Sequence, residues 1–326
     1  MSKFFITGGA GFIGSFVTRY LIEKRISRSV VIFDHFARYL SPFKKNTSDY
    51  YPLRFKGLED ETSVERGETQ NYSVVYDCLE KHNPDYIIHL AAVPLANAPN
   101  YNVSEMRVGS VDTTSTLLEA IGKLKQRGKL QIKKFLYISS SMVYGDFSSK
   151  VAIESDPTLP KEIYGTMKLS GEIVTKGLCN YFEIPYSIIR PSAVYGPTDM
   201  NRRVSQIFIE KAIAKEKLII HGENEYLDFT FVKDLAKGIV LSCMNEKTNT
   251  EILNITYGQS HSLLDYVKSL EQILGNLEYE IVPRDKSKPK RGTLSISKAK
   301  KLIGYTPEYD LNKGIQEYYD FLTSLS

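Results

Sequence analysis

The feature that most constrains this chain is an apolar segment that ends in a glycine-rich turn. Residues 4–6 are apolar, and Thr7 leads into Gly8-Gly9-Ala10-Gly11-Phe12-Ile13-Gly14. A second apolar segment, residues 30–33, ends at Asp34. A strand, a tight turn, a helix and a second strand with a terminal acidic residue form the βαβ unit of dinucleotide-binding sheets. The pattern therefore predicts an α/β fold with a dinucleotide site, although a glycine-rich turn alone also occurs at ordinary strand-to-helix corners.

Each of three glycines in the turn has a separate predicted task. Gly8 permits the tight turn, Gly11 lets a pyrophosphate approach backbone N–H groups, and Gly14 lets the helix pack closely on the sheet. The helix N-terminus then faces the phosphates, where its unpaired N–H groups favour negative charge. Asp34 lies twenty residues beyond Gly14, where a carboxylate accepts hydrogen bonds from the adenosine ribose and repels a 2′-phosphate. We therefore expect NAD rather than NADP.

The composition is typical of a globular enzyme. The chain has 326 residues, 42% of them hydrophobic, which suffices for one large domain or two closely joined ones. No stretch approaches the roughly 18 apolar residues of a membrane span or the profile of a signal peptide, so a cytoplasmic location and no membrane partner are expected. Cys78, Cys179, Cys243 and the five histidines show no metal-ligand spacing, and no metal is expected.

One basic stretch raises the question of a nucleic-acid partner. Residues 284–291 contain two arginines and three lysines, with no aromatic residues between them. The net charge of the whole chain is only +4, and a well-patterned helix follows directly, so the three lysines favour a solvated loop over a nucleic-acid interface. Arg291 is considered separately below. No nucleic-acid partner is expected.

The first half of the chain alternates apolar strands with helical segments. Continuous apolar strands require a sheet covered on both faces, so we predict a doubly wound parallel (Rossmann) sheet with right-handed crossovers. The irregular residues 35–63 are either a loop over the adenine or an insertion. The expected strands are 4–7, 30–34, 86–90, 134–139 and 186–190, and the expected helices are 11–24, 72–81, 104–126 and 163–182.

This alternation sets the expected domain organisation. Residues 1–190 are expected to form the NAD-binding Rossmann domain, to which residues 228–250 return. Residues 191–326 are expected to form mainly a smaller C-terminal α/β domain that binds the substrate.

A serine run and a Tyr-Lys pair form a second group of polar residues. Ser140 follows a central strand, and Tyr164 and Lys168 are four residues apart, so that both project from one face of a helix. Because the carboxyl ends of the strands open onto the cofactor crevice, the three side chains are expected to converge beside the nicotinamide. There the ammonium and the oxidised ring would lower the pKa of the phenol. We expect Tyr164 to act as general base with assistance from Ser140, while Lys168 also holds the nicotinamide ribose.

Together these motifs resemble the extended short-chain dehydrogenase/reductases of the nucleotide-sugar epimerase and dehydratase family. The resemblance covers nearly the whole chain and adds Phe12, Ile13, Glu68, Leu90, Ala91, Ala92 and Pro191 to the implied NAD site. The similar segments are TGGAGFIG at 7–14, Asp34, Gly67-Glu68, His89-Leu90-Ala91-Ala92, the serine run with Val143-Tyr144-Gly145, Tyr164 with Lys168, residues 190–197, residues 228–232 with Asp234, and Arg291-Gly292.

The resemblance implies a reaction whose first step forms a transient keto-sugar. Tyr164 takes the proton of a sugar hydroxyl while a hydride passes to NAD, and the fate of the keto-sugar then differs among members. Dehydratases of the family usually have an acid pair directly after the hydroxyl residue, and decarboxylases tend to have a Glu, whereas this chain has Ser141 and Met142. An NAD-dependent nucleotide-sugar epimerase is therefore favoured. A 4,6-dehydratase, decarboxylase or reductase is the alternative, and a noncatalytic NAD-binding regulatory protein is the non-enzyme alternative.

The family binds the diphosphate of its nucleotide-diphosphate sugar with arginines, because a guanidinium holds two phosphate oxygens at once. Arg291 matches the family's late arginine and is expected to reach the diphosphate. The family's other common arginine is replaced by Leu227, and Arg202 and Arg203 are expected to supply the missing charge.

Other positions of the expected substrate site suggest a variant of the common recognition pattern. Ser141, Met142 and Ala193 are expected to line it, and Ala193 stands where the family often has Asn. Ser110 stands in place of a second asparagine, ahead of the long helix. The sugar, the nucleotide base and the reacting carbon stay open.

The resemblance also implies a homodimer. Its interface would be a four-helix bundle made by helices 104–126 and 163–182 of both subunits, with Leu117, Leu118 and Ile173 as apolar residues. Periodicity alone does not separate such an interface from core packing.

Overall fold

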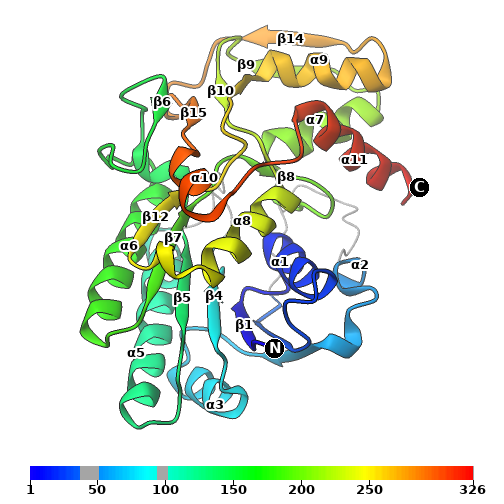
Figure 1. The fold of residues 1–326 in the computed structure, drawn as a ribbon. Helices are drawn as coiled ribbons and strands as arrows, with labels where there is room; N and C mark the ends of the chain where they lie inside the picture. The colour runs from blue at the N-terminus through cyan, green and yellow to red at the C-terminus, as the bar shows by residue number, and fades with distance from the viewer. Residues whose placement is uncertain (37–50, 94–101, 326) are drawn as a thin grey trace.

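The computed structural model describes residues 1–36, 51–93 and 102–325. Its centre is a seven-stranded sheet in the order β3-β2-β1-β4-β5-β7-β12, and all the neighbouring strands are parallel (Figure 1). The predicted doubly wound parallel sheet is confirmed. The strands are β1 (Phe4–Thr7), β2 (Val30–Asp34), β3 (Thr62–Arg66), β4 (Tyr86–His89), β5 (Lys134–Ile138), β7 (Tyr186–Arg190) and β12 (Glu251–Asn254).

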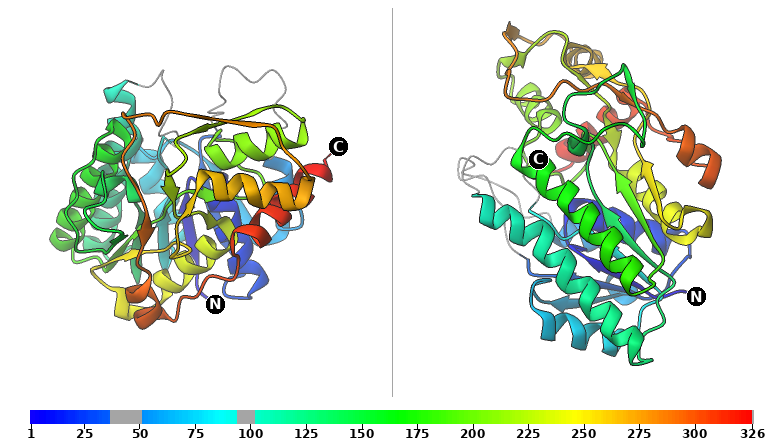
Figure 2. Two further views of the ribbon diagram at one scale, coloured as in Figure 1. Left: turned by 90° about the horizontal axis from the view of Figure 1, so that it is seen from above. Right: turned by 90° about the vertical axis from the view of Figure 1, so that its left-hand side faces the viewer.

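Helices cover both faces of this sheet, because successive side chains of each strand point to opposite faces. Phe4 and Ile6 pack into one core with α1 and α8, and Phe5 packs into the other core with α3 and α5. Figure 2 shows α5 and α6 side by side on the second face. The covering helices are α1 (Phe12–Glu23), α3 (Tyr72–His82), α5 (Thr113–Gln126), α6 (Ile163–Tyr181), α8 (Val232–Met244) and α10 (Ser297–Ile303).

The long helix expected at 104–126 is not uniform. It consists of α4 (Val103–Arg107), a π-helical turn (Val108–Asp112) and α5. Thr114 donates its hydroxyl hydrogen to the carbonyl of Ser110 at 2.5 Å, and such a bond to the preceding turn competes with the regular helical ladder. Predictions from apolar periodicity do not detect this local change.

Part of the stretch expected to be irregular is regular. It contains α2 (Tyr51–Phe55), a 3-10 turn (Glu59–Glu61) and the first two residues of the edge strand β3. The sequence of β3, Thr-Ser-Val-Glu-Arg, lacks a continuous apolar run because none of its side chains is buried. Whether this stretch covers the adenine depends on residues 37–50, which lie outside the described residues.

After residue 190 the chain leaves the sheet and then returns to it. Helix α8 packs against α1, and β12 pairs with β7 at the edge of the sheet. A third core, beside the carboxyl ends of the central strands (Figure 1), contains residues of α7 (Val204–Ile213), α9 (Leu263–Leu274), α11 (Leu311–Thr323) and β9 (Leu218–His221). Strand β14 (Tyr279–Val282) pairs in parallel with β9, but none of its side chains is buried. Short two-stranded pairs connect the parts: β8 (Val194–Tyr195) with β11 (Thr230–Phe231), β10 (Tyr226–Leu227) with β13 (His261–Ser262), and β6 (Val151–Ala152) with β15 (Thr293–Leu294).

Candidate active site

The carboxyl ends of β1, β4 and β5 open into a cavity of about 990 Å³ that α7 and α9 also line. The strand order reverses between β1 and β4, which is where open α/β sheets bind their ligands. Every site residue predicted from the sequence lies in the lining of this one cavity: Gly8, Gly11, Phe12, Ile13, Gly14, Asp34, Glu68, Leu90, Ala91, Ala92, Ser140, Ser141, Met142, Tyr164, Lys168, Pro191, Ala193, Arg202, Arg203 and Arg291.

The glycine-rich turn is packed too closely to hold larger residues. Gly8 has a φ of +67°, and a Cβ there would lie 2.7 Å from the backbone nitrogen of Ala91. A Cβ on Gly14 would lie 2.6 Å from the carbonyl oxygen of Gly8. No side chain caps the start of α1, where backbone N–H groups and the helix dipole favour an anion. The turn therefore fits the pyrophosphate of NAD.

Asp34 is buried and has a structural task in addition to the expected contact with the adenosine ribose. Its Oδ2 accepts a hydrogen bond from the backbone of Ala10 at 3.0 Å, and its Oδ1 accepts one from the backbone of Phe36 at 2.9 Å. A carboxylate has about four acceptor positions, so Asp34 retains capacity for ribose hydroxyls. It thus fixes the glycine-rich turn as well as offering a ribose contact.

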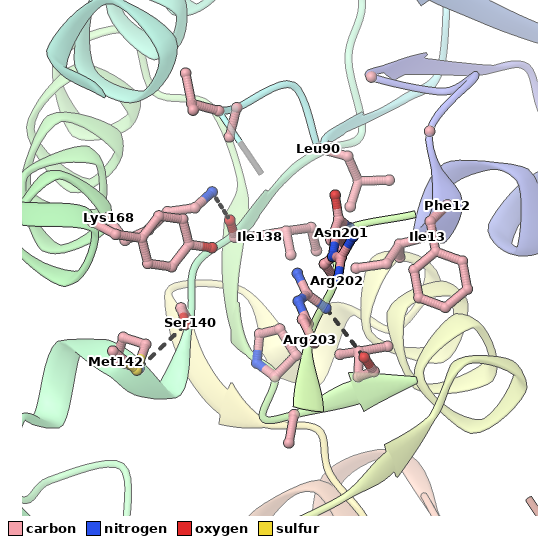
Figure 3. A pocket seen from close by; sticks show the side chains of 18 of the residues that line it. Phe12, Ile13, Leu90, Ile138, Ser140, Met142, Lys168, Asn201, Arg202 and Arg203 are labelled. Carbon is pink, nitrogen blue, oxygen red and sulfur yellow. Dashed lines mark hydrogen bonds between the residues drawn. The ribbon is translucent and has the colours of Figure 1, made fainter. Parts of the chain in front are cut away.

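The expected catalytic residues gather on one side of the cavity. Lys168 donates to the carbonyl of Ile138 at 2.8 Å, and the hydroxyl oxygen of Ser140 accepts from the backbone of Met142 at 3.2 Å. Figure 3 shows both side chains across the cavity from Phe12 and Ile13. Burial lowers the pKa of Lys168 to about 8, and Glu172 opposes this shift.

The electrostatics of Tyr164 differ from the prediction. Burial raises the pKa of its phenol, and the groups that lower this pKa are the guanidinium of Arg203 and the hydroxyl of Ser140. The ammonium of Lys168, expected to lower it, is instead bound to the Ile138 carbonyl. Arg203 therefore lowers the pKa of the phenol, a contribution that the sequence did not predict.

Arg202 and Arg203 project into the centre of the cavity (Figure 3). Arg203 donates to the carbonyl of Val194 at 3.1 Å, and Leu227, which replaces the usual arginine, is buried in the same lining. The structure therefore brings both arginines into the same cavity lining as Leu227.

Arg291 lies deep in the cavity among charges. Burial lowers its pKa to about 10, whereas Glu162 and Glu225 raise it. These two carboxylates have other cations as direct partners: Glu162 binds Lys288 at 2.8 Å and Glu225 binds Arg284 at 2.6 Å. Among the described residues, no carboxylate forms a direct ion pair with Arg291, so its guanidinium can bind an anionic ligand.

The interpretation of residues 284–291 as a solvated loop is wrong for part of this stretch. Of its three lysines, Lys286 and Lys290 are exposed, as this interpretation requires, whereas Lys288 forms an ion pair with Glu162, which lines the cavity. Arg284 likewise pairs with Glu225 of the lining, and Arg291 lines the cavity, where it was expected. Sequence reasoning missed Glu162 and Glu225 as cavity residues. For Glu162 the available signal was its place two residues before Tyr164.

The described residues offer neither a metal site nor a membrane span. Across residues 1–36, 51–93 and 102–325, no group of three His, Cys, Asp or Glu side chains could hold a metal ion. In the same part of the chain, no helix combines the length and apolar character needed to cross a membrane.

Comparison with known proteins places this geometry in context. The model of the NAD dependent epimerase/dehydratase family matches residues 4–256. An uncharacterized UDP-glucose epimerase of Bacillus subtilis is 28% identical over 99% of this chain and 98% of its own length. UDP-glucuronic acid decarboxylase 1 of Xenopus tropicalis is 28% identical over 97% of this chain and 70% of its own length. The crystal structure of a UDP-glucuronic acid 4-epimerase from Bacillus cereus, in complex with UDP-glucuronic acid and NAD, has a TM-score of 0.87 and 28% identity, and covers 99% of this chain and 100% of its own.

These matches agree with the geometry of the cavity. The family is NAD-dependent, and the closely packed turn with Asp34 fits that cofactor. The chain belongs to the NAD-dependent epimerase/dehydratase family.

Proposed function

We propose that this chain is an NAD-dependent nucleotide-sugar epimerase that inverts a hydroxyl-bearing carbon through a transient keto-sugar. The observation that carries this proposal is the pair of residues after Ser140. Ser141 and Met142 are 1% and 9% exposed and line the cavity. Elimination of water requires one group that removes a proton and another that delivers one. A hydroxyl and a thioether supply neither, whereas epimerisation requires one base that later returns its proton.

Tyr164 is the proposed base. Its phenolate oxygen takes the proton of the sugar hydroxyl, and Ser140 donates a hydrogen bond to the same sugar oxygen. Arg203 and Ser140 stabilise the phenolate against the effect of burial. NAD, when bound, would supply the acceptor for the hydride that leaves the sugar carbon and the donor for its return to the opposite face. The phenol then returns its proton to the sugar oxygen, so Tyr164 ends the cycle as it began.

The residues that would hold NAD form the opposite side of the cavity. The N-terminus of α1 would bind the pyrophosphate and Asp34 the adenosine ribose, while Lys168 would bind the nicotinamide ribose. The remaining contacts would come from residues that line the cavity near these three: Gly8, Gly11, Phe12, Ile13, Gly14, Glu68, Leu90, Ala91, Ala92 and Pro191.

The substrate is proposed to be a nucleotide-diphosphate sugar, with UDP-sugars as the first class to test. Arg291 has no carboxylate as a direct partner among the described residues, and Arg202 and Arg203 line the same cavity. A diphosphate satisfies such guanidinium groups through paired hydrogen bonds. Relatives named for UDP-glucose and for UDP-glucuronic acid support the choice of nucleotide.

One observation favours a dehydratase or decarboxylase as the second candidate. Oε2 of Glu162 is buried and has no hydrogen-bond partner within the described part of the chain. Glu162 lines the cavity two residues before Tyr164, where a carboxylate can supply the acid–base chemistry that Ser141 and Met142 lack. A decarboxylase is also among the relatives of this chain.

We also propose a homodimer formed through α5 and α6. The expectation that Leu117 and Leu118 lie at the interface is wrong, because that face of α5 packs against the sheet and both side chains are fully buried in the subunit. Ile173 on α6 is 64% exposed and is the apolar residue of the expected set that remains for an interface.

Product analysis tests the proposed reaction. Purified protein would be incubated with UDP-glucose, UDP-glucuronic acid and matching GDP-, CDP- and dTDP-sugars, and the products identified by NMR. The proposal predicts a sugar with one inverted hydroxyl at unchanged mass. A 4-keto-6-deoxy sugar, or loss of carbon dioxide from a uronic acid, would instead support the second candidate.

A further inference from the structure

One carboxylate, Glu172 on α6, connects the segment that carries Ser140 with the helix that carries Tyr164 and Lys168. It lies four residues after Lys168 and eight after Tyr164, so all three project from one face of the helix. Its side chain is fully buried, and its Oε1 accepts a hydrogen bond from the hydroxyl of Ser139 at 2.6 Å. Because Ser139 directly precedes Ser140, Glu172 links the end of β5 to the helix that carries Tyr164.

Arg190 on β7 completes this buried group. Its Nε donates to Oε1 of Glu172 at 2.9 Å, and its Nη2 donates to Oε2 at 2.7 Å. Arg190 also donates to the carbonyl of Glu154 at 3.2 Å and lies 4.8 Å from the ring centre of Tyr144. A buried carboxylate persists when it is paired and fully hydrogen-bonded. Glu172 therefore fixes β5, β7 and α6 relative to one another.

Glu172 also acts on the charge of Lys168. Tyr137 on β5 lies beneath this ammonium, 5.2 Å from ring centre to Nζ, and His89 on β4 is neutral because burial lowers its pKa to about 3. Tyr164 lies one turn away on α6, and Arg190 faces Glu172 from β7. Of these groups, Glu172 is the one that opposes the effect of burial on the pKa of Lys168.

We propose that Glu172 is a positioning residue for the reaction. Through Ser139 it sets the place of Ser140 relative to Tyr164, and its negative charge keeps Lys168 protonated. The inference rests on the function proposed above. Mutation can separate the positional effect of Glu172 on Ser140 from the effect of its charge on Lys168.

Ser139→Ala removes the positional link and leaves the charge of Glu172 in place. Because small misplacements of reacting groups are costly, kcat should fall between about tenfold and a hundredfold with little change in KM. The matched control is Ser187→Ala on β7. Ser187 is also buried, and its hydroxyl donates to Thr248, at 2.7 Å from the carbonyl oxygen and 3.1 Å from the hydroxyl oxygen, but it does not line the cavity. Its kcat should equal that of the parent.

The double variant Glu172→Gln with Arg190→Met removes both buried charges and keeps an oxygen that accepts from Ser139. Of the two charges, the Glu172 carboxylate is the one that opposes the effect of burial on the pKa of Lys168. It also leaves no buried arginine without a partner, and the thioether side chain introduced on β7 can pack against Tyr144. With the carboxylate gone, Lys168 should lose its proton at lower pH. The alkaline limb of kcat should move down by about one pH unit, the size of shift that one nearby charge produces. The affinity for NAD, measured by calorimetry across the same pH range, should show the same displacement.

The inference is overturned if Ser139→Ala keeps the parent's kcat, or if the double variant keeps the parent's alkaline limb in both measurements. If the double variant does not fold, the kcat of Ser139→Ala compared with that of Ser187→Ala tests the inference by itself. If the parent itself converts no sugar nucleotide, the proposed function fails. The pH dependence of NAD affinity then still tests Glu172 by itself.

Discussion

The two sides of the cavity are built in different ways. The cofactor side is built around one continuous segment, residues 8–14, in which a Cβ added at Gly8 or Gly14 would lie less than 3 Å from backbone atoms. The substrate side combines charged side chains from distant segments, such as Glu162, Arg203 and Arg291. Backbone geometry has a local sequence signature, whereas the pairing of distant charges has none. The cofactor side therefore depends on close backbone packing, whereas the substrate side depends on which charged side chains the fold brings together.

The largest expected effect comes from Tyr164→Phe, which removes the proposed base between the cofactor side and the substrate side. Loss of the base should lower kcat by about a thousandfold, within the range for general base catalysis. NAD should remain bound, because the glycine-rich turn is unchanged. Steady-state kinetics and the NAD content of the purified variant check both statements. Turnover equal to that of the parent would contradict the proposed mechanism.

The cofactor side should respond to a single methyl group. In Gly14→Ala the new Cβ meets the backbone of Gly8 and Gly9 at 2.6–2.7 Å, so the turn must shift at a cost of about 1–3 kcal/mol. Affinity for NAD and the free energy of unfolding should both fall. The control is Gly177→Ala on α6, where nothing lies within 4 Å of the added Cβ. There stability should rise by about 0.5–1 kcal/mol. Equal NAD affinity in the two variants would show that the turn is not specified by shape.

The substrate side should respond to the loss of a charge. Arg291→Met should raise KM for the sugar nucleotide about ten- to a hundredfold, which corresponds to a hydrogen bond to a charged group. NAD affinity should not change. Lys290→Met, at the exposed neighbouring position, is the control and should keep the parent's KM. An unchanged KM in Arg291→Met would remove this residue from the diphosphate site.

Deprotonation of Lys168 should change the activity and the free energy of unfolding in opposite directions as the pH rises. The pKa of this residue is about 8 in the folded protein, against an ordinary value of 10.5. Between these values the unfolded chain binds more protons, so the contribution of Lys168 to the free energy of unfolding rises with pH. Activity should fall over the same range, because Lys168 loses its positive charge. Kinetics and urea unfolding from pH 7 to pH 10 measure both, and a constant kcat would contradict the role of the ammonium.

Much of the site could be predicted because its motifs are contiguous. The glycine-rich turn, the serine run and the Tyr-Lys pair each reveal their geometry through local spacing. The effect of Arg203 on Tyr164 could not be predicted, because it depends on where the residues after β8 cross the cavity. The same holds for the ion pair of Glu162 with Lys288, which are 126 residues apart. In the fold, β3 was missed because an exposed edge strand needs no apolar run.

The smallest expected effect on activity concerns a surface outside the cavity. Ile173→Glu places a charge on the exposed face of α6 and should convert the proposed dimer to a monomer, because a charge buried without a partner is costly. Light scattering measures the mass. Ile281→Glu on β14, at a position that is 43% exposed, is the control and should leave the mass unchanged. If Ile173→Glu keeps the parent's mass, this face is not the interface.

The most direct test of the central claim is the fate of the sugar hydrogen in deuterium oxide. If a hydride leaves the reacting carbon and returns to it, that hydrogen never exchanges with water. The account predicts an epimer with protium at the inverted carbon, as read by NMR of the product formed in deuterium oxide. Deuterium at that carbon would contradict the proposed mechanism.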